Sequence, residues 1–256
     1  MKPAAFEHAR PTSLADAVAL LRDGARVLAG GQSLGPMLNL RLVQPRMLVQ
    51  VNRLPELCGV AADDAAVSIG ACVTHAAIAD GLVPDIGDGV LARVAEGIAY
   101  RAVRNRGTIG GSLCHADPAA DWVTVLTALD AVVVLHGASG DRELGMADFV
   151  CGAFQTALMP GEILRAVRVP RLPSDARWGY EKACRKPGDF AHAMAAVLIR
   201  GEQRRAVIGA LGGKSLLLEG EVASEAGALH ALRSLEPVQR HMQVTVLRRA
   251  FAKAEA

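Results

Sequence analysis

Short apolar runs alternate with amphipathic segments over the first fifty residues, which predicts strands alternating with helices. Leu14, Val18 and Leu21 fall on one helical face. Ser13 stands before them as an N-cap and Gly24 follows them as a terminator. The expected order is a first strand, the helix from Ser13 to Gly24, a strand at residues 26–29, a helix capped by Ser33 that carries Leu34, Leu38 and Leu42, and a strand at residues 47–51. This alternation predicts a small parallel sheet.

The pattern changes between residues 54 and 170, where short strands are mixed with helices. Strands are expected at residues 67–69, 131–136 and 163–169, and helices at residues 88–99 and 118–128. Asp117 and Pro118 occupy positions favoured for an N-cap and a first helical residue. Pro170 and Pro173 bracket a linker, and a helical segment of mixed charge follows Leu235. The expected parts are therefore residues 1–53, 54–172 and 173–256.

The composition excludes two classes of protein. A net charge of +2 over 256 residues is too small for a nucleic-acid binder that acts through a broad basic surface. No apolar run reaches the ~18 residues of a membrane helix, because Asp130 interrupts the longest one. The mean hydropathy of +0.25 is nevertheless high, which indicates Ala-rich helices, a large partner interface, or both.

Cysteine and histidine positions predict no metal site on this chain. The five cysteines stand singly, without a CxxC pair, which argues against a disulfide framework, a zinc site or an iron–sulfur cluster. A reducing compartment, the cytoplasm, is expected. His75, His115 and His192 have no carboxylate or thiolate at ligand spacing, so they are interpreted as hydrogen-bonded core or surface residues.

Two glycine loops carry the candidate chemistry. Residues 29–33 (Ala-Gly-Gly-Gln-Ser) and 108–112 (Thr-Ile-Gly-Gly-Ser) each pair two glycines with a following hydroxyl residue. Glycines allow positive φ and let backbone amides approach an anion. One such loop is more often a structural turn, but two in one chain favour a shared diphosphate. Neither loop fits the GxGxxG or the P-loop pattern, which disfavours a standard Rossmann or NTPase site.

The chain resembles the FAD-binding medium subunit of molybdenum hydroxylases, the family of carbon monoxide dehydrogenase and xanthine dehydrogenase. The segments that carry the resemblance are residues 27–34 and 36–38, residues 103–113 and 116–121, and residues 179–182 with Arg185 and residues 189–191. By this resemblance the fold is α+β, with a two-subdomain FAD-binding unit of the PCMH/vanillyl-alcohol-oxidase type and a small α+β C-terminal domain.

The resemblance also implies the site. The expected FAD-binding residues are Ala29, Gly30, Gly31, Gln32, Ser33, Leu34, Thr108, Ile109, Gly110, Gly111, Ser112, Asp121, Leu164 and Lys182. The two loops would wrap the diphosphate, and Lys182 would lie near the isoalloxazine, where a cation favours the reduced ring. Judged by residue type alone, Asp121 is more often a helix first-turn carboxylate, Lys182 a solvated charge and Leu164 a core residue.

The implied function is electron transfer. A large partner subunit would hold the molybdenum cofactor, and a small one would pass electrons through 2Fe-2S clusters to FAD on this chain, in a dimer of heterotrimers. No side chain is expected to act as nucleophile or general base. The alternatives are a free-standing FAD-dependent oxidase or dehydrogenase, and a scaffold subunit without cofactor.

Three departures from the family pattern are visible. Gln32 and Ser112 replace residues that are commonly His and often Asn in relatives, but both remain polar. The C-terminal part is expected to be shortened. A cysteine-rich insertion for a 4Fe-4S cluster is not present in the sequence, so no such cluster is expected.

Overall fold

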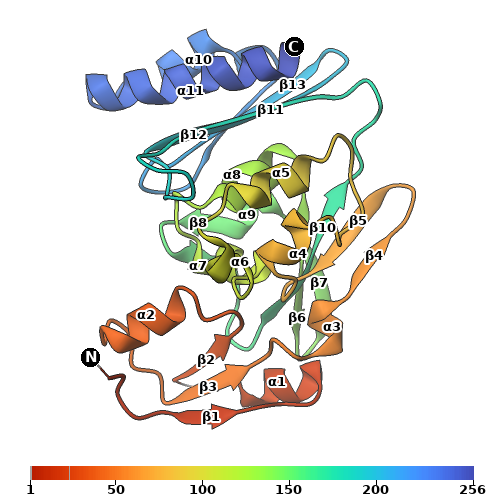
Figure 1. Cartoon of the computed structure of the whole chain (residues 1–256), viewed down its shortest axis with the longest axis vertical. Coiled ribbons are helices and arrows are strands. Elements are labelled where there is room, and N and C mark those ends of the chain that lie inside the picture. The colour runs from red at the N-terminus through yellow and green to blue at the C-terminus, as the bar shows by residue number, and fades with distance from the viewer. Residues whose placement is uncertain (1, 23) are drawn as a thin grey trace.

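The three larger β-sheets of the described residues are stacked along the long axis of the molecule (Figure 1). The computed structural model describes residues 2–22 and 24–256. Each sheet with its helices forms one tier: an N-terminal tier, a middle tier and a C-terminal tier. Each sheet lies within one of the three expected parts of the chain, whose boundaries remain a prediction.

The N-terminal tier is the predicted parallel sheet. Its strands run in the order β1-β3-β2, and its elements are β1 (Glu7–Ala9), α1 (Leu14–Leu20), β2 (Ala25–Leu28), α2 (Leu34–Asn39) and β3 (Met47–Gln50). Ser13 caps α1 as expected, its hydroxyl accepting from the amide of Asp16 at 3.1 Å. The prediction that Ser33 caps α2 is wrong, because the Ser33 side chain makes no capping hydrogen bond.

The end of α2 also differs from the sequence expectation. Arg41 adopts a left-handed conformation with φ of 57°, and the amide of Leu42 donates to the carbonyl of Met37 at 2.9 Å. This is the geometry of a Schellman-type helix end. Leu42 therefore lies outside the helix and is 69% exposed, contrary to the predicted apolar face.

The middle tier is built on a five-stranded antiparallel sheet of order β4-β5-β10-β6-β7. Its strands are β4 (Val60–Ala62), β5 (Ala66–Gly70), β6 (Val132–Gly137), β7 (Gly140–Gly145) and β10 (Ile163–Pro170), with a small pair β8 (Val150–Gly152) and β9 (Gln155–Thr156). Its helices are α3 (Pro55–Cys58), α4 (His75–Ala79), α5 (Val90–Glu96), α6 (Arg101–Arg104), α7 (Ile109–His115), α8 (Asp121–Ala128) and α9 (Met146–Phe149). The three strands predicted for this region are confirmed.

The two helices predicted for this region begin later than expected. Asp88 and Gly89 have φ of 54° and 61°, so α5 starts only at Val90. Asp117 does not cap α8: its carboxylate accepts from the amide of Ala119 at 2.9 Å and closes a turn. The helix starts at Asp121, because the aspartate side chain stabilises the local turn instead.

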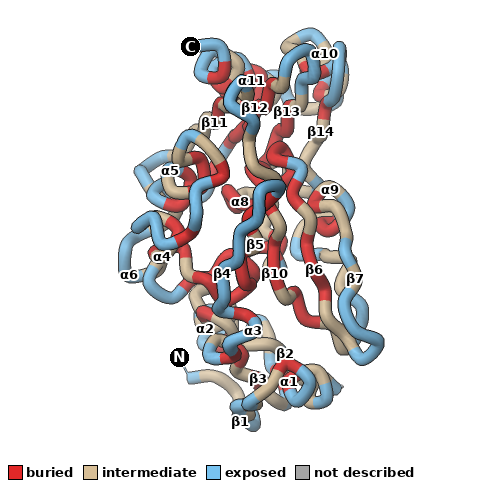
Figure 2. The backbone as a smooth tube through the Cα atoms, turned by 90° about the vertical axis from the view of Figure 1, so that its right-hand side faces the viewer, coloured by how far each residue is buried: buried red, intermediate tan, exposed pale blue. Residues whose placement is uncertain are grey.

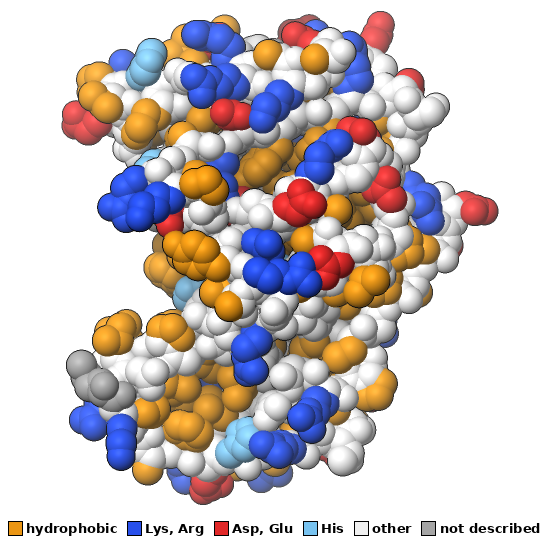
Figure 3. Space-filling view, viewed as in Figure 1, with side chains coloured by type: hydrophobic (Ala, Val, Ile, Leu, Met, Phe, Trp, Pro, Cys, Tyr) orange, Lys and Arg blue, Asp and Glu red, His pale blue; other side chains and the backbone are white. Residues whose placement is uncertain are grey.

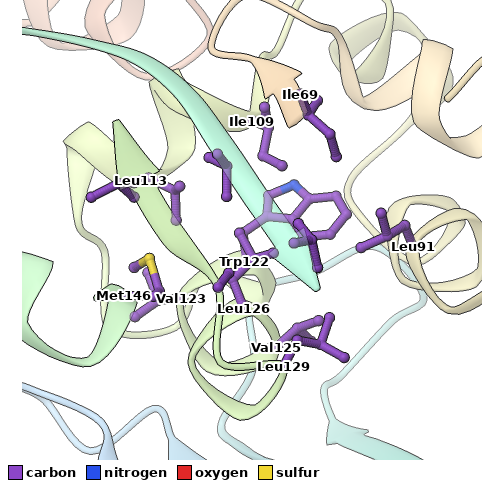
Figure 4. Packing of buried hydrophobic residues seen from close by; sticks show 14 of the residues in the cluster. Ile69, Leu91, Ile109, Leu113, Trp122, Val123, Val125, Leu126, Leu129 and Met146 are labelled. Atoms are coloured by element: carbon purple, nitrogen blue, oxygen red, sulfur yellow. The ribbon is translucent and has the colours of Figure 1, made fainter. Parts of the chain in front are cut away.

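Helix α8 is the centre of the molecule. All eight of its residues are buried, and it packs against β12 and β13 of the C-terminal tier as well as within its own tier. Figure 4 shows the indole of Trp122 among the side chains of Ile69, Leu91 and Ile109. Burial on all sides explains why five of its eight residues are apolar, and why its polar residues Asp121, Thr124 and Thr127 are buried as well.

The C-terminal tier is a four-stranded antiparallel sheet of order β11-β12-β13-β14. Its elements are β11 (Arg177–Ala183), β12 (Ala193–Arg200), β13 (Gln203–Gly209), β14 (Leu216–Glu219), a 3-10 turn (Gly220–Val222), α10 (Glu225–Ala231) and α11 (Pro237–Glu255). The predicted helix after Leu235 is confirmed as α11. Helix α11 covers one face of this sheet and α8 the other, so β12 is buried along almost its whole length (Figure 2).

None of the described helices is both long and apolar enough to cross a membrane.

Close packing of α11 on β11 gives the first testable prediction. A Cβ at Gly179 would overlap the backbone of Ala250 and lie 2.9 Å from the amide nitrogen of Ala254. We expect Gly179→Ala to lower the free energy of unfolding by about 1–3 kcal/mol, measured by urea denaturation. The control is Gly145→Ala, which meets nothing within 4 Å and should change stability by less than about 0.5 kcal/mol. Equal unfolding midpoints for the two variants would contradict this packing.

Candidate functional site

The first glycine loop, residues 29–34, presents a row of backbone amides. Gly31 takes a φ of 71°, which turns the chain sharply between β2 and α2. Among the residues that the structure describes, no acceptor is found for the five consecutive amides from Gly30 to Leu34. Consecutive amides that converge from such a turn form a concave anion-binding nest. The loop therefore has the donors that a diphosphate needs.

The second loop, residues 108–112, uses its amides internally. The Thr108 hydroxyl caps α7 by accepting from the amide of Gly111 at 3.0 Å. Ile109 donates to Val73 at 3.1 Å, and Gly110 donates to Ala71 at 2.9 Å. Ser112 donates to the carbonyl of Thr108 at 3.0 Å. The two loops look alike in sequence. The amides of the second loop are used in hydrogen bonds within the protein, whereas the amides of the first loop remain free to donate to a ligand.

The two loops meet at a backbone contact. A Cβ at Gly30 would overlap the carbonyl oxygen of Arg106 and lie 2.9 Å from the Cα of Gly107. A Cβ at Gly111 would lie 3.9 Å from that of Ala29. Figure 3 shows the surface hollowed on the left-hand side between the N-terminal tier and the middle tier. The loops lie at the junction of these two tiers.

A buried ionic cluster joins α8 to the C-terminal sheet. The Lys182 ammonium lies 2.8 Å from Oδ1 of Asp121 and donates to the carbonyl of Gly97 at 3.0 Å. The Tyr180 hydroxyl donates to the same Oδ1 at 2.7 Å. Burial, together with the neighbouring carboxylate of Asp121, raises the pKa of Tyr180 well above its ordinary value. The Lys182 side chain is only 10% exposed, so its interpretation as a solvated charge is wrong.

The connection between β11 and β12 is pinned to the middle tier. Ala99 donates to the carbonyl of Gly188 at 3.1 Å, and Gly188 has a φ of 86°. Arg104 holds the middle-tier side of this contact: its Nη1 donates to the carbonyls of Ile98 and Ala99 at 3.0 and 2.9 Å. Arg104 and Tyr180 lie in the segments that carry the family resemblance, but neither was expected from the sequence to have a role.

Leu164 lies in the core of the middle tier. Its side chain is 2% exposed and belongs to the middle-tier cluster. The strand has a bulge between Leu164 and Ala166, where Arg165 accepts from the amide of Ala71 at 2.9 Å. Because Ala71 also accepts from Gly110, β10 supports the second loop through one intervening residue.

The histidines have structural surroundings. His75 is buried, its Nδ1 accepts from the Trp122 indole at 3.1 Å, and burial lowers its pKa to about 4. The His115 ring packs 5.1 Å from that of Phe154, and His192 is exposed. Within residues 2–22 and 24–256, no group of three or more His, Cys, Asp or Glu side chains is placed to hold a metal ion.

Comparison with known proteins identifies the family. Residues 4–172 match the model of the FAD binding domain in molybdopterin dehydrogenase. The chain is 36% identical over 283 residues to subunit alpha of the 6-hydroxypseudooxynicotine dehydrogenase complex of Paenarthrobacter nicotinovorans, covering 99% of this chain and 96% of the relative. It is 39% identical over 203 residues to the carbon monoxide dehydrogenase medium chain of Hydrogenophaga pseudoflava, covering 78% and 71%.

Solved structures agree with the sequence comparisons. A carbon monoxide dehydrogenase from Hydrogenophaga pseudoflava that lacks the Mo-pyranopterin moiety superposes with a TM-score of 0.92 at 33% identity, covering 100% of this chain and 99% of that one. The fold class and FAD as cofactor are thereby confirmed as predicted. The chain belongs to the FAD-binding medium subunits of molybdenum-containing dehydrogenases.

Proposed function

We propose that this chain is the electron-transfer flavoprotein subunit of a cytoplasmic, heterotrimeric molybdenum hydroxylase. It would accept electrons from 2Fe-2S clusters on a small partner subunit and pass them through FAD to a final acceptor. A large partner subunit with the molybdenum cofactor would oxidise the substrate, and two heterotrimers would form a dimer. The observation that carries the proposal is the row of amides from Gly30 to Leu34 without an acceptor among the described residues.

The residues present fit FAD at this place. The amides of the first loop would bind the diphosphate oxygens, because a nest of N–H groups selects an anion. Thr108, Gly111 and Ser112 would form the opposite wall. The complete proposed contact set is Ala29, Gly30, Gly31, Gln32, Ser33, Leu34, Thr108, Ile109, Gly110, Gly111, Ser112, Asp121, Leu164 and Lys182.

The chain itself contributes orientation and electrostatics. When bound, FAD supplies the redox chemistry, taking up electrons and delivering them to an acceptor. Asp121 and the carbonyl of Gly97 fix the Lys182 ammonium in one position. The Tyr180 hydroxyl donates a hydrogen bond to Asp121 and so holds the carboxylate in place beside Lys182. The family resemblance assigns Lys182 to the flavin side of the site, where the ion pair would present a fixed dipole with its positive end on lysine.

Exposed apolar side chains support the existence of partner subunits. Leu40 and Leu42 follow α2 and are 56% and 69% exposed. Tyr100 and Phe190, 65% and 62% exposed, adjoin the contact between Ala99 and Gly188. A contiguous patch of exposed apolar side chains marks a surface that binds another protein, so these two pairs are the candidates for such a patch. The large partner interface that the high mean hydropathy indicates remains a prediction.

Purification from the native host tests the proposed complex. An affinity-tagged chain should bring down iron, acid-labile sulfide and molybdenum together with FAD. Leu42→Asp should reduce the yield of iron and molybdenum while FAD is retained, because the substitution places a charge on the proposed interface. A chain that elutes alone with FAD would support a free-standing flavoenzyme. A colourless chain that still brings down both metals would support a scaffold.

Two neighbouring glycines test the diphosphate site. Gly30→Ala places a methyl group against the backbone of Arg106, whereas Gly35→Ala meets nothing within 4 Å. Strain of about 1–3 kcal/mol at residue 30 should weaken FAD binding on the order of tenfold, measured by fluorescence titration of the deflavinated chain. Gly35→Ala should bind FAD like the unchanged protein. Full affinity in Gly30→Ala would remove the first loop from the site.

The ion pair predicts opposite shifts of the flavin reduction potential. Lys182→Met leaves a negative charge beside the reduced ring and should lower the potential. Asp121→Asn leaves an uncompensated cation and should raise it. A charge contributing about 0.5–2 kcal/mol shifts a two-electron couple by about 10–40 mV. The double variant should return close to the original value. Equal shifts of one sign in both single variants would show a structural effect in place of an electrostatic one.

A further inference from the structure

Three successive carbonyls beyond the end of α5 bind two cationic side chains. The carbonyl of Gly97 accepts from the Lys182 ammonium at 3.0 Å. The carbonyls of Ile98 and Ala99 accept from Nη1 of Arg104 at 3.0 and 2.9 Å. Carbonyls at a helix C-terminus have no partner within the helix and attract positive charge. Arg104 therefore binds the residues that directly follow the one that holds Lys182.

The turn formed by residues 97–99 depends on contacts from outside it. Ala99 has a φ of 46°, a left-handed conformation that costs free energy for a residue with a Cβ. Its amide donates to the carbonyl of Gly188 at 3.1 Å, and its carbonyl accepts from Arg104. A conformation of this kind persists only where its surroundings hold it, and Arg104 supplies two of the hydrogen bonds that do so.

The Arg104 side chain itself has a fixed base. Arg104 ends α6, and two residues later the backbone of Arg106 lies against Gly30 of the first loop. The Nε of Arg104 is buried and has no hydrogen-bond partner among the residues that the structure describes. An anchored backbone and a buried stem leave the guanidinium few other positions. Its two hydrogen bonds therefore hold the turn in one conformation.

Each acceptor of Lys182 has its own support. The carboxylate of Asp121 is held by the hydroxyl of Tyr180 at 2.7 Å. The carbonyl of Gly97 is held through the turn that Arg104 binds. Loss of either support would leave the ammonium with one fixed acceptor.

We infer that Arg104 is a positioning residue, which fixes the Gly97 carbonyl and through it the ammonium of Lys182. Beside a bound flavin, Arg104 would thus hold the cation of Lys182 at one place. This effect on the flavin rests on the proposed function, whereas the effect on Lys182 does not.

The reactivity of Lys182 tests the positioning without flavin. The full chain, after removal of its flavin, is acetylated to a low extent, and the modification of Lys182 is compared by mass spectrometry with that of the exposed Lys214. Arg104→Met removes both hydrogen bonds and keeps an unbranched side chain. It should make Lys182 react severalfold faster, because one of its two acceptors is no longer held.

A neighbouring arginine on α6 provides the control. Arg101 pairs with Asp80 at 2.6 Å on the surface, so Arg101→Met removes a charge from the same helix without touching residues 97–99. The rate of Lys182 should stay as in the unchanged chain. An equally slow Lys182 in Arg104→Met would overturn the inference.

Arg104→Lys serves if Arg104→Met does not fold. Lysine keeps the charge but is one bond shorter, so it should reach one carbonyl at most and give a smaller rise in the rate of Lys182. A rate equal to that of the unchanged chain would overturn the positioning role in this variant as well.

The reduction potential of the bound flavin tests the consequence. Arg104→Met should lower the potential by less than Lys182→Met does, and it should cause no further shift when added to Lys182→Met. A direct field of the Arg104 charge would shift the potential equally in both backgrounds and would overturn an action through Lys182. If Lys182→Met leaves the potential unchanged, the proposed place of the flavin is wrong, and the acetylation rates alone decide the role of Arg104.

Discussion

The contact between Gly30 and the backbone of residues 106 and 107 sets the distance between the N-terminal and middle tiers. A side chain at residue 30 would overlap the Arg106 carbonyl, so the tiers close to this distance only with glycine. The amides of residues 30–34 follow this contact and have no acceptor among the residues that the structure describes. The row of open amides thus lies where the two tiers pack together.

Helix α8 connects the C-terminal tier to the middle tier, which carries the second glycine loop. Its first residue, Asp121, receives Lys182 and Tyr180 from β11, and Ala99 and Gly188 join the same tiers a short distance away. A buried ion pair contributes little net stability, because desolvation offsets most of the attraction. Its value here is orientation: the lysine is held at a fixed place by two acceptors from the middle tier.

The hydrophobic pattern of the sequence predicted those strands and helices that local interactions determine. The parallel sheet and the strands at residues 67–69, 131–136 and 163–169 were visible because burial repeats along each of them. The ends of helices were missed where the backbone turns left-handed at Arg41 and Asp88, or where an aspartate closes a turn. The pairing of Asp121 with Lys182 spans 61 residues, so no local spacing reveals it. Only the family resemblance singled out Leu164, whose side chain is an ordinary core residue.

The two glycine loops differ in the residue that stands two positions before each glycine pair. In the second loop this residue is Thr108, whose hydroxyl takes the amide of Gly111. In the first loop it is Leu28, which has no acceptor in its side chain and instead faces Gly31, its Cδ1 lying 3.3 Å from where a Cβ would be. The amide of Gly31 is therefore left for a ligand, while that of Gly111 is used to begin a helix. A glycine pair supplies the close approach in both loops. The second loop keeps fewer free amides than the first, because Thr108 Oγ1 and the carbonyls of Val73 and Ala71 accept from it.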